Sequence, residues 1–279
     1  MNRSLSSIVP THVVREGGGF MVRRPVAMGR LMSPFLLLDE MGPVVYGPGE
    51  AIGAPSHPHR GFETVTYLLD GGMVHEDSAG NSGALNPGDV QWMTAGRGVI
   101  HSELPQDALL EQGGRMHGFQ IWVNLPAKHK MMAPRYQDIP SAVLPVATNT
   151  DGTVWAKVIA GSTMGVTSII DTVIPITFIH VVLQPGAVFT HACDPVHNLM
   201  VYAFEGAMEV EGRTLEDGQL GILSAGESLT ITAAEEGATC LLLGGPPLDE
   251  PIARYGPFVM NTRDEIVQAI QDYNNGTLA

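Results

Sequence analysis

Short runs of apolar and β-branched residues, bounded by glycine, proline, asparagine or aspartate, recur along most of the chain. They predict strands at residues 62–69, 90–93, 118–124, 178–183, 199–204, 208–210, 220–223, 229–232 and 240–243. The 33 glycines and 20 prolines suit the tight turns that such short strands need. Many short strands at this spacing are typical of a β-sandwich or β-barrel, so we predict an all-β fold.

One segment near the C-terminus has the pattern of a helix instead. Thr262 and Glu265 form a Thr-x-x-Glu capping box, and apolar side chains follow with helical spacing at Ile266, Ile270 and Tyr273. We predict a short packing helix here, without a chemical role.

The chain also repeats an order of strands and glycine corners. Gly88–Gly96 aligns with Gly218–Gly226 at an offset of 130, and each copy follows a strand that ends in glycine, at Gly71 and at Gly206. A matched order of several elements predicts a duplicated barrel.

The segment between the two copies is rich in proline. Met131–Pro145 contains three prolines and is the natural linker. We therefore predict two tandem domains, 1–135 and 145–279, with the helix closing the second.

Composition and charge limit the functions that are open to this chain. Hydrophobic residues make up 44% and charged residues 16%, which is typical of a core-forming globular protein. The 29 acidic residues outnumber the 15 Lys and Arg, giving a net charge of −14. An acidic chain repels phosphate backbones, so we expect no direct binding of nucleic acid.

The two cysteines and the N-terminus bear on location. Cys193 and Cys240 lie in apolar, strand-like segments outside any CxxC motif, which favours free thiols in a reducing cytoplasm. The N-terminus lacks the apolar core of a signal peptide, and no apolar run approaches membrane-spanning length. We expect a soluble cytoplasmic protein with no membrane association.

Two short motifs carry the chemistry of the chain. His57-Pro-His59 and His101-Ser-Glu103 each place two ligand types at i and i+2, which face the same way on a strand with Cα atoms about 6.5–7 Å apart. Two such pairs on neighbouring strands can aim four side chains at one ion. Three imidazoles and one carboxylate suit Fe(II), Cu(II), Ni(II), Mn(II) or Zn(II) and leave coordination positions open.

The surrounding segments resemble a known family. HPHRGFETVTYLLDG, HEDSAGNSGALNPGDVQWMTAGRGVIHSELP and GFQIWVNLP closely resemble the pirin family of two-domain cupins, as do PFLLLDE upstream and GGPPLDEPIARYGPFVMNT near the C-terminus. The resemblance spans most of the chain and is weakest between about Ser141 and Thr190. It implies two tandem cupin β-barrels of the jelly-roll type.

The resemblance implies a metal site in the first domain. Its ligands would be His57, His59, His101 and Glu103, the four residues of the two motifs. Glu63 occupies the glutamate position of the general cupin motif, where we expect it to support the site instead of binding metal. Fe(II) is the expected ion, with Ni, Co, Mn, Cu or Zn as alternatives.

Other residues are weaker candidates for a role at a metal site or in its cavity. In the second domain His180, His191 and His197 form no comparable pair, so we expect a C-terminal domain without metal. In the first domain His75 and His117 could line the cavity or serve a structural role. Gln120, Trp122, Trp92 and Met93 are candidates for the pocket or the core, with core packing the ordinary outcome.

The resemblance also implies an activity. Members of this family act as quercetin 2,3-dioxygenases, so we expect a metal-dependent dioxygenase whose substrates are dioxygen and a small phenolic compound such as a flavonol. Glu103, a carboxylate at the metal, is the expected catalytic base for the substrate hydroxyl.

Two alternatives stay open at this point. The chain could be a non-catalytic, redox-sensing regulator that binds a transcription factor or a metabolic enzyme, since its acidic charge favours a protein partner over DNA. It could also act on another small substrate, for which quercetin is a surrogate. We expect a monomer, because a two-barrel chain already pairs two domains.

Overall fold

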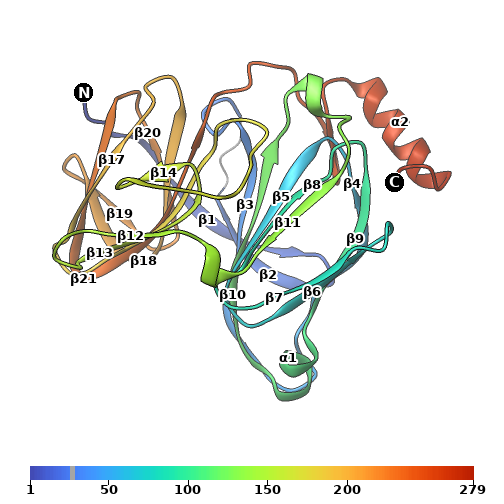
Figure 1. Cartoon of the computed structure of the whole chain (residues 1–279), viewed down its shortest axis with the longest axis horizontal. Helices are drawn as coiled ribbons and strands as arrows, with labels where there is room; N and C mark the ends of the chain where they lie inside the picture. Colours follow the sequence, from blue (N-terminus) through green and yellow to red (C-terminus); the bar gives the residue numbers. More distant parts are fainter. Residues whose placement is uncertain (26–28) are drawn as a thin grey trace. The chain divides into compact units, whose positions relative to one another are not determined.

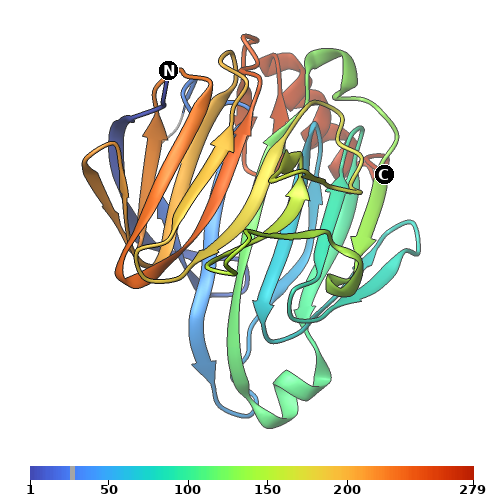
Figure 2. The ribbon, with the colours of Figure 1, turned by 60° about the vertical axis from the view of Figure 1, so that its left-hand side comes forward.

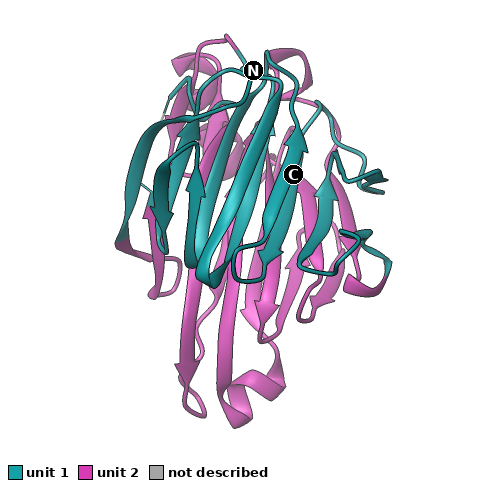
Figure 3. Cartoon of the chain, turned by 90° about the vertical axis from the view of Figure 1, so that its left-hand side faces the viewer, with its two compact units in different colours: residues 1–12, 25–34, 143–248 teal, residues 13–24, 35–142, 249–279 magenta. Residues whose placement is uncertain are grey.

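The computed structural model describes residues 1–25 and 29–279, which form mainly β-strands (Figure 1). The chain divides into two compact units, shown in different colours in Figure 3. Unit 1 contains residues 1–12, 25–34 and 143–248, and unit 2 contains residues 13–24, 35–142 and 249–279. The predicted all-β class is confirmed.

Unit 2 holds two antiparallel sheets. The order of the larger is β11 (Arg135–Ile139), β8 (Val90–Thr94), β5 (Phe62–Asp70), β10 (Gly114–Asn124), β3 (Phe35–Tyr46) and β2 (Phe20–Pro25). The order of the smaller is β4 (Ala54–His59), β9 (Val99–Pro105), β6 (Met73–Asp77) and β7 (Ser82–Leu85). The unit also contains a hairpin formed by β22 (Ala253–Tyr255) and β23 (Phe258–Met260). Two short 3-10 helices follow β10 and β11, at Ala127–His129 and Ser141–Val143. The paired ends of β3 and β10 extend toward the loop that carries α1 (Asp107–Gln112), as Figures 1 and 2 show.

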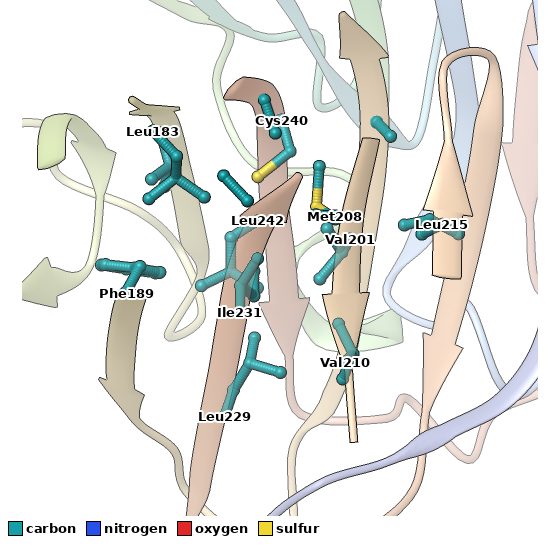
Figure 4. Packing of buried hydrophobic residues seen from close by; sticks show 14 of the residues in the cluster. Leu183, Phe189, Val201, Met208, Val210, Leu215, Leu229, Ile231, Cys240 and Leu242 are labelled. Atoms are coloured by element: carbon teal, nitrogen blue, oxygen red, sulfur yellow. The ribbon is translucent and has the colours of Figure 1, made fainter. Parts of the chain in front are cut away.

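Unit 1 is built around two long strands that pair with each other, β18 (Asn198–Val210) and β21 (Ser228–Gly245). Its main order is β1 (Leu5–Glu16), β20 (Gln219–Leu223), β18, β21, β16 (Thr177–Leu183), β13 (Val154–Ala160) and β12 (Val146–Thr148). The remaining strands are β17 (Val188–Ala192) beside β21, β19 (Arg213–Glu216) beside β18, and the pair β14 (Ser162–Thr163) and β15 (Val166–Thr167). Figure 4 shows apolar side chains of β17, β18 and β21 gathered between these strands, where they form the core of the unit.

Two pairs of predicted strands turn out to be single strands. The predictions at 199–204 and 208–210 both lie in β18, and those at 229–232 and 240–243 both lie in β21. In β18 the register shifts between Ala203 and Glu205 and again between Gly206 and Met208, but Glu205 and Gly206 stay paired with β21, so the strand continues through them.

The predicted internal repeat is visible as equivalent hydrogen bonding in the two units. β5 pairs with β8 in unit 2, as β18 pairs with β20 in unit 1. The N–H of Gly88 donates to the carbonyl of Leu68 at 2.7 Å, and the N–H of Gly218 donates to the carbonyl of Ala203 at 2.9 Å. These four residues occupy matching positions of the aligned segments, so the two halves share one local architecture.

The two units differ from the predicted boundaries of 1–135 and 145–279 at both ends of the chain. The first residues belong to unit 1, because Leu5–Pro10 pairs with β20. The last residues belong to unit 2, where the side chain of Arg60 forms an ion pair with Asp272 at 2.6 Å. Each unit is therefore assembled from segments that lie far apart in the sequence.

The predicted C-terminal helix is α2 (Arg263–Asn274). Its capping box is present: Thr262 Oγ1 accepts a hydrogen bond from the N–H of Glu265, and the Glu265 carboxylate accepts one from the N–H of Thr262. Ile266 is buried against β23. Within residues 1–25 and 29–279, no helix combines the length and the apolar character needed to cross a membrane.

The two glycine corners beside the candidate metal motifs contact each other. The N–H of Gly61 donates to the carbonyl of Gly96 at 2.8 Å. Gly61 has a φ of +91°, and a Cβ at this position would lie 2.0 Å from the carbonyl oxygen of Val259. Gly96 has a φ of +51°, and a Cβ there would lie 2.2 Å from the carbonyl oxygen of Met132. Neither corner has room for a side chain, so both packing and conformation require glycine.

We expect Gly61→Ala to destabilise the protein much more than Gly80→Ala. Gly80 also has a positive φ, +87°, but its Cβ position is open, so alanine there meets only the conformational cost of about 1–2 kcal/mol. Gly61→Ala adds a backbone clash, and we expect its free energy of unfolding to fall by at least about 2 kcal/mol more. Urea denaturation of the two variants measures the difference, and equal losses would contradict this account of the corner.

Candidate metal centre

The four predicted ligand residues come from two neighbouring strands of the smaller sheet in unit 2. β4 carries His57 and His59, and β9 carries His101 and Glu103. In the antiparallel register His57 lies directly opposite His101. Because side chains two residues apart on a strand share a face, this register brings the two motifs to the same face of the sheet.

The three imidazoles converge. The ring centroids of His57 and His59 are 4.7 Å apart, those of His57 and His101 are 4.5 Å apart, and those of His59 and His101 are 5.0 Å apart. One ring nitrogen from each lies within 4.8 Å of the other two. In the part of the chain that the structure describes, this is the one group of three potential ligand residues close enough to share an ion.

The hydrogen bonding of these rings leaves nitrogen lone pairs available. His57 is half-buried and donates from Nδ1 to the carbonyl of Pro55 at 2.8 Å, which fixes the ring and leaves Nε2 as its potential ligand atom. Both ring nitrogens of His101 are buried without a hydrogen-bond partner among the described residues. The two ring nitrogens of His59 also lack a hydrogen bond of normal geometry among these residues, although an interaction with the backbone of Pro257 favours the protonated ring. Buried polar atoms of this kind normally have a partner, and a metal ion would supply it.

Burial keeps the rings of His59 and His101 in the neutral form that binds metal. Desolvation lowers the pKa of His101 to about 4, against an opposing effect of Glu103. Desolvation, followed by repulsion from His101 and His57, lowers the pKa of His59 well below its ordinary value. The three-histidine arrangement therefore fits a transition metal at neutral pH.

Glu103 lies beside this triad. Its Oε1 accepts a hydrogen bond from Thr66 Oγ1 at 3.0 Å, and its Oε2 lies 4.0 Å from Nε2 of His101. Two ligands that each lie about 2.1 Å from one ion are about 3–4 Å apart, so Oε2 is within reach of an ion held by the histidines. Thr66 Oγ1 is also 2.7 Å from the side-chain oxygen position of Gln120. Since one hydroxyl donates one hydrogen bond, Gln120 presents its amide NH₂ to Thr66 whenever Thr66 donates to Glu103.

Glu63 lies apart from the group of three histidines. It is fully buried, and its Oε1 accepts a hydrogen bond from Thr94 Oγ1 at 2.6 Å. The structure joins these two residues to each other.

His75 and His117 each have a carboxylate partner. His75 is the register neighbour of Glu103 on β6, and its Nε2 lies 3.2 Å from Asp138 Oδ2. His117 Nε2 lies 2.9 Å from Glu40 Oε1. Asp138 falls inside the predicted linker, and no pattern in the sequence predicted its contact with His75.

His180, His191 and His197, which all belong to unit 1, have separate surroundings. His191 Nδ1 lies 3.1 Å from the hydroxyl of Thr163, His197 Nε2 lies 3.8 Å from a carboxylate oxygen of Asp194, and His180 contacts the rings of neighbouring aromatic residues.

A cavity of about 580 Å³ opens beside His57, His59 and Glu103, entirely within unit 2. Its walls are mainly apolar and include Phe20, Met21, Met41, Val44, Ile52 and Met116. Of the four candidates for the pocket or the core, Gln120 and Trp122 line the cavity. Trp92 and Met93 are fully buried core residues. Arg24 and Arg254 also line it, and no motif in the sequence pointed to either.

Two family models match separate parts of the chain. Residues 19–123 match the model described as Pirin. Residues 178–279 match the model described as Pirin C-terminal cupin domain. The two matches cover most of the sequence and assign a cupin domain to each half.

Individual relatives agree over nearly the whole length. A Vibrio cholerae protein with the provisional name quercetin 2,3-dioxygenase is 41% identical over 99% of this chain and 97% of its own. Human pirin is 39% identical over 93% of this chain and 88% of its own. The crystal structure of quercetin 2,3-dioxygenase from Acinetobacter baumannii is 38% identical, with a TM-score of 0.94 over 100% of this chain and 99% of its own. The chain therefore belongs to the pirin family and has its two tandem cupin domains.

Proposed function

We propose that this protein is a metal-dependent dioxygenase that cleaves flavonols such as quercetin, with one divalent transition metal held by His57, His59, His101 and Glu103. The observation that carries the proposal is the convergence of three imidazoles, those of His59 and His101 buried, at one side of an apolar cavity. The names of the Vibrio cholerae relative and the Acinetobacter baumannii structure refer to the same reaction.

The donor set suits a first-row ion. Three imidazoles and one carboxylate accept Fe(II), our expected metal, and also Ni, Co, Mn, Cu or Zn. When bound, a redox-active ion supplies Lewis acidity toward a phenolic oxygen and a centre for dioxygen chemistry. The hydrogen bond from His57 to Pro55 orients that ring for ligation through Nε2.

Glu103 is the proposed catalytic base. Its Oε2 has no hydrogen-bond donor among the described residues, while Oε1 is held by Thr66. A substrate hydroxyl placed at the histidines can therefore transfer its proton to Oε2 while Thr66 keeps the carboxylate in position. Gln120 holds Thr66 in turn, so these two side chains orient the base.

The cavity favours an aromatic substrate. Its volume of about 580 Å³ lies in the usual range for small-molecule sites, about 300–1,000 Å³. Trp122 and the methionine-rich walls offer apolar surface for a planar ring, and they exclude water from the reacting end.

We expect His101→Ala to abolish both metal binding and turnover. The variant removes one of three converging nitrogens, so protein reconstituted with Fe(II) should lose its stoichiometric ion and stop consuming dioxygen in the presence of quercetin. Metal analysis and an oxygen electrode measure the two effects. His12→Ala, which removes an exposed histidine from unit 1, is the matched control and should retain both.

Flavonol turnover by His101→Ala at the wild-type rate would contradict the assigned centre. Metal-loaded wild-type protein that binds flavonols and consumes no dioxygen would contradict the dioxygenase proposal. That second result would favour the redox-sensing regulator.

We expect Glu103→Gln to reduce turnover by about 10²–10⁴-fold, because an amide cannot accept the substrate proton. The three histidines remain in this variant, so metal content should fall far less than in His101→Ala. Glu76→Gln, an exposed change on the neighbouring strand β6, should leave turnover unchanged. Initial rates at saturating quercetin make the comparison, and a Glu103→Gln rate within a factor of two of wild type would exclude the proposed base.

A further inference from the structure

The cavity has a second polar end, formed by Arg254 of β22. Its guanidinium carbon lies 4.7 Å from the ring centroid of Trp122 in a cation–π contact. The same indole ring lies 5.6 Å from the ring of His59. All three residues line the cavity, so the guanidinium and the candidate metal centre face one space and contact the same aromatic side chain.

Arg254 has most of its hydrogen-bonding capacity free. Within residues 1–25 and 29–279 it forms no ion pair with a carboxylate, and its one hydrogen bond runs from Nη1 to the carbonyl of Leu36 at 3.4 Å. A guanidinium carries five N–H donors in a planar fork that matches a carboxylate. The fork is therefore available to a ligand in the cavity.

Arg24, the other arginine of the cavity wall, is in contrast already paired with two carboxylates. Its Nε and Nη2 donate to the two carboxylate oxygens of Asp39 at 2.5 and 2.6 Å, and its guanidinium also pairs with Glu16 at 2.6 Å. Both nearby acids are thus committed to Arg24. Burial, followed by repulsion from Arg24, lowers the pKa of Arg254 against the opposing effects of Asp39 and Glu16, so an anion in direct contact with Arg254 would stabilise its charge.

From these contacts we propose that Arg254 and Trp122 form a subsite for the carboxylate of an aromatic acid. The ring of the ligand packs on the apolar wall, and its carboxylate accepts two hydrogen bonds from the guanidinium fork. The placement of a ligand hydroxyl at the opposite, histidine end rests on the proposed function. The cavity therefore selects hydroxylated aromatic carboxylates over neutral phenols of the same size.

Isothermal titration of the full-length, metal-loaded protein with two matched ligands tests the subsite. 4-Hydroxycinnamate carries the carboxylate, and its primary amide has the same shape without the charge. We expect wild type to bind the acid at least about tenfold more tightly than the amide, which is the effect of one charged hydrogen-bonded contact. Arg254→Gln should remove this preference and leave amide binding unchanged. Arg263→Gln, an exposed arginine on α2, should retain the preference.

An equal affinity of wild type for acid and amide would overturn the proposal without the need for any variant. An unchanged acid preference in folded Arg254→Gln would also overturn it. Arg254→Lys keeps the charge but loses the fork, so it should restore part of the preference. Cinnamate and cinnamamide lack the hydroxyl and test Arg254 alone. The protein should bind cinnamate more tightly than cinnamamide even if it shows no dioxygenase activity. This outcome separates the present proposal from the proposed function.

Discussion

The antiparallel pairing of β4 with β9 is the constraint on which the candidate centre depends. It sets His57 opposite His101, and the two-residue spacing within each motif brings His59 and Glu103 to the same face. A slip of one residue would turn these side chains away from one another. The contact between the turns at Gly61 and Gly96 joins the segments that follow β4 and β8, and it accepts no side chain. Local geometry and close packing thus fix the register together.

Burial gives this centre its chemical character. The enclosed imidazoles are held neutral, with nitrogens that lack hydrogen-bond partners among the described residues. Such groups make folding less favourable unless an ion compensates for them, so metal binding and the stability of unit 2 should be coupled. Glu103 differs because Thr66 already stabilises one of its oxygens. One carboxylate oxygen is therefore positioned, while the other remains free for an ion or a proton.

The cavity extends this chemistry away from the histidines. Trp122 contacts both His59 and Arg254, so the proposed aromatic ligand would meet a metal-binding group and a cationic group in one cavity. Arg24 lines the same wall and is neutralised by Asp39 and a second acid. The difference between the two arginines follows from their partners, since both carry the same charge in isolation.

The β class, the internal repeat, the capped C-terminal helix and the two ligand motifs could all be predicted from the amino-acid sequence. Each of these depends on residues close together in the chain, whose periodicity or spacing is visible without a structure. The segments that complete each unit could not be predicted in this way, because they depend on long-range strand pairing such as that of Leu5–Pro10 with β20; the folded structure was needed to find them. The folded structure also shows that Thr66 supports Glu103, that Asp138 contacts His75 and that Arg254 lines the cavity. These contacts join residues far apart in sequence, and their geometry comes from strand pairing and packing, which no local pattern records.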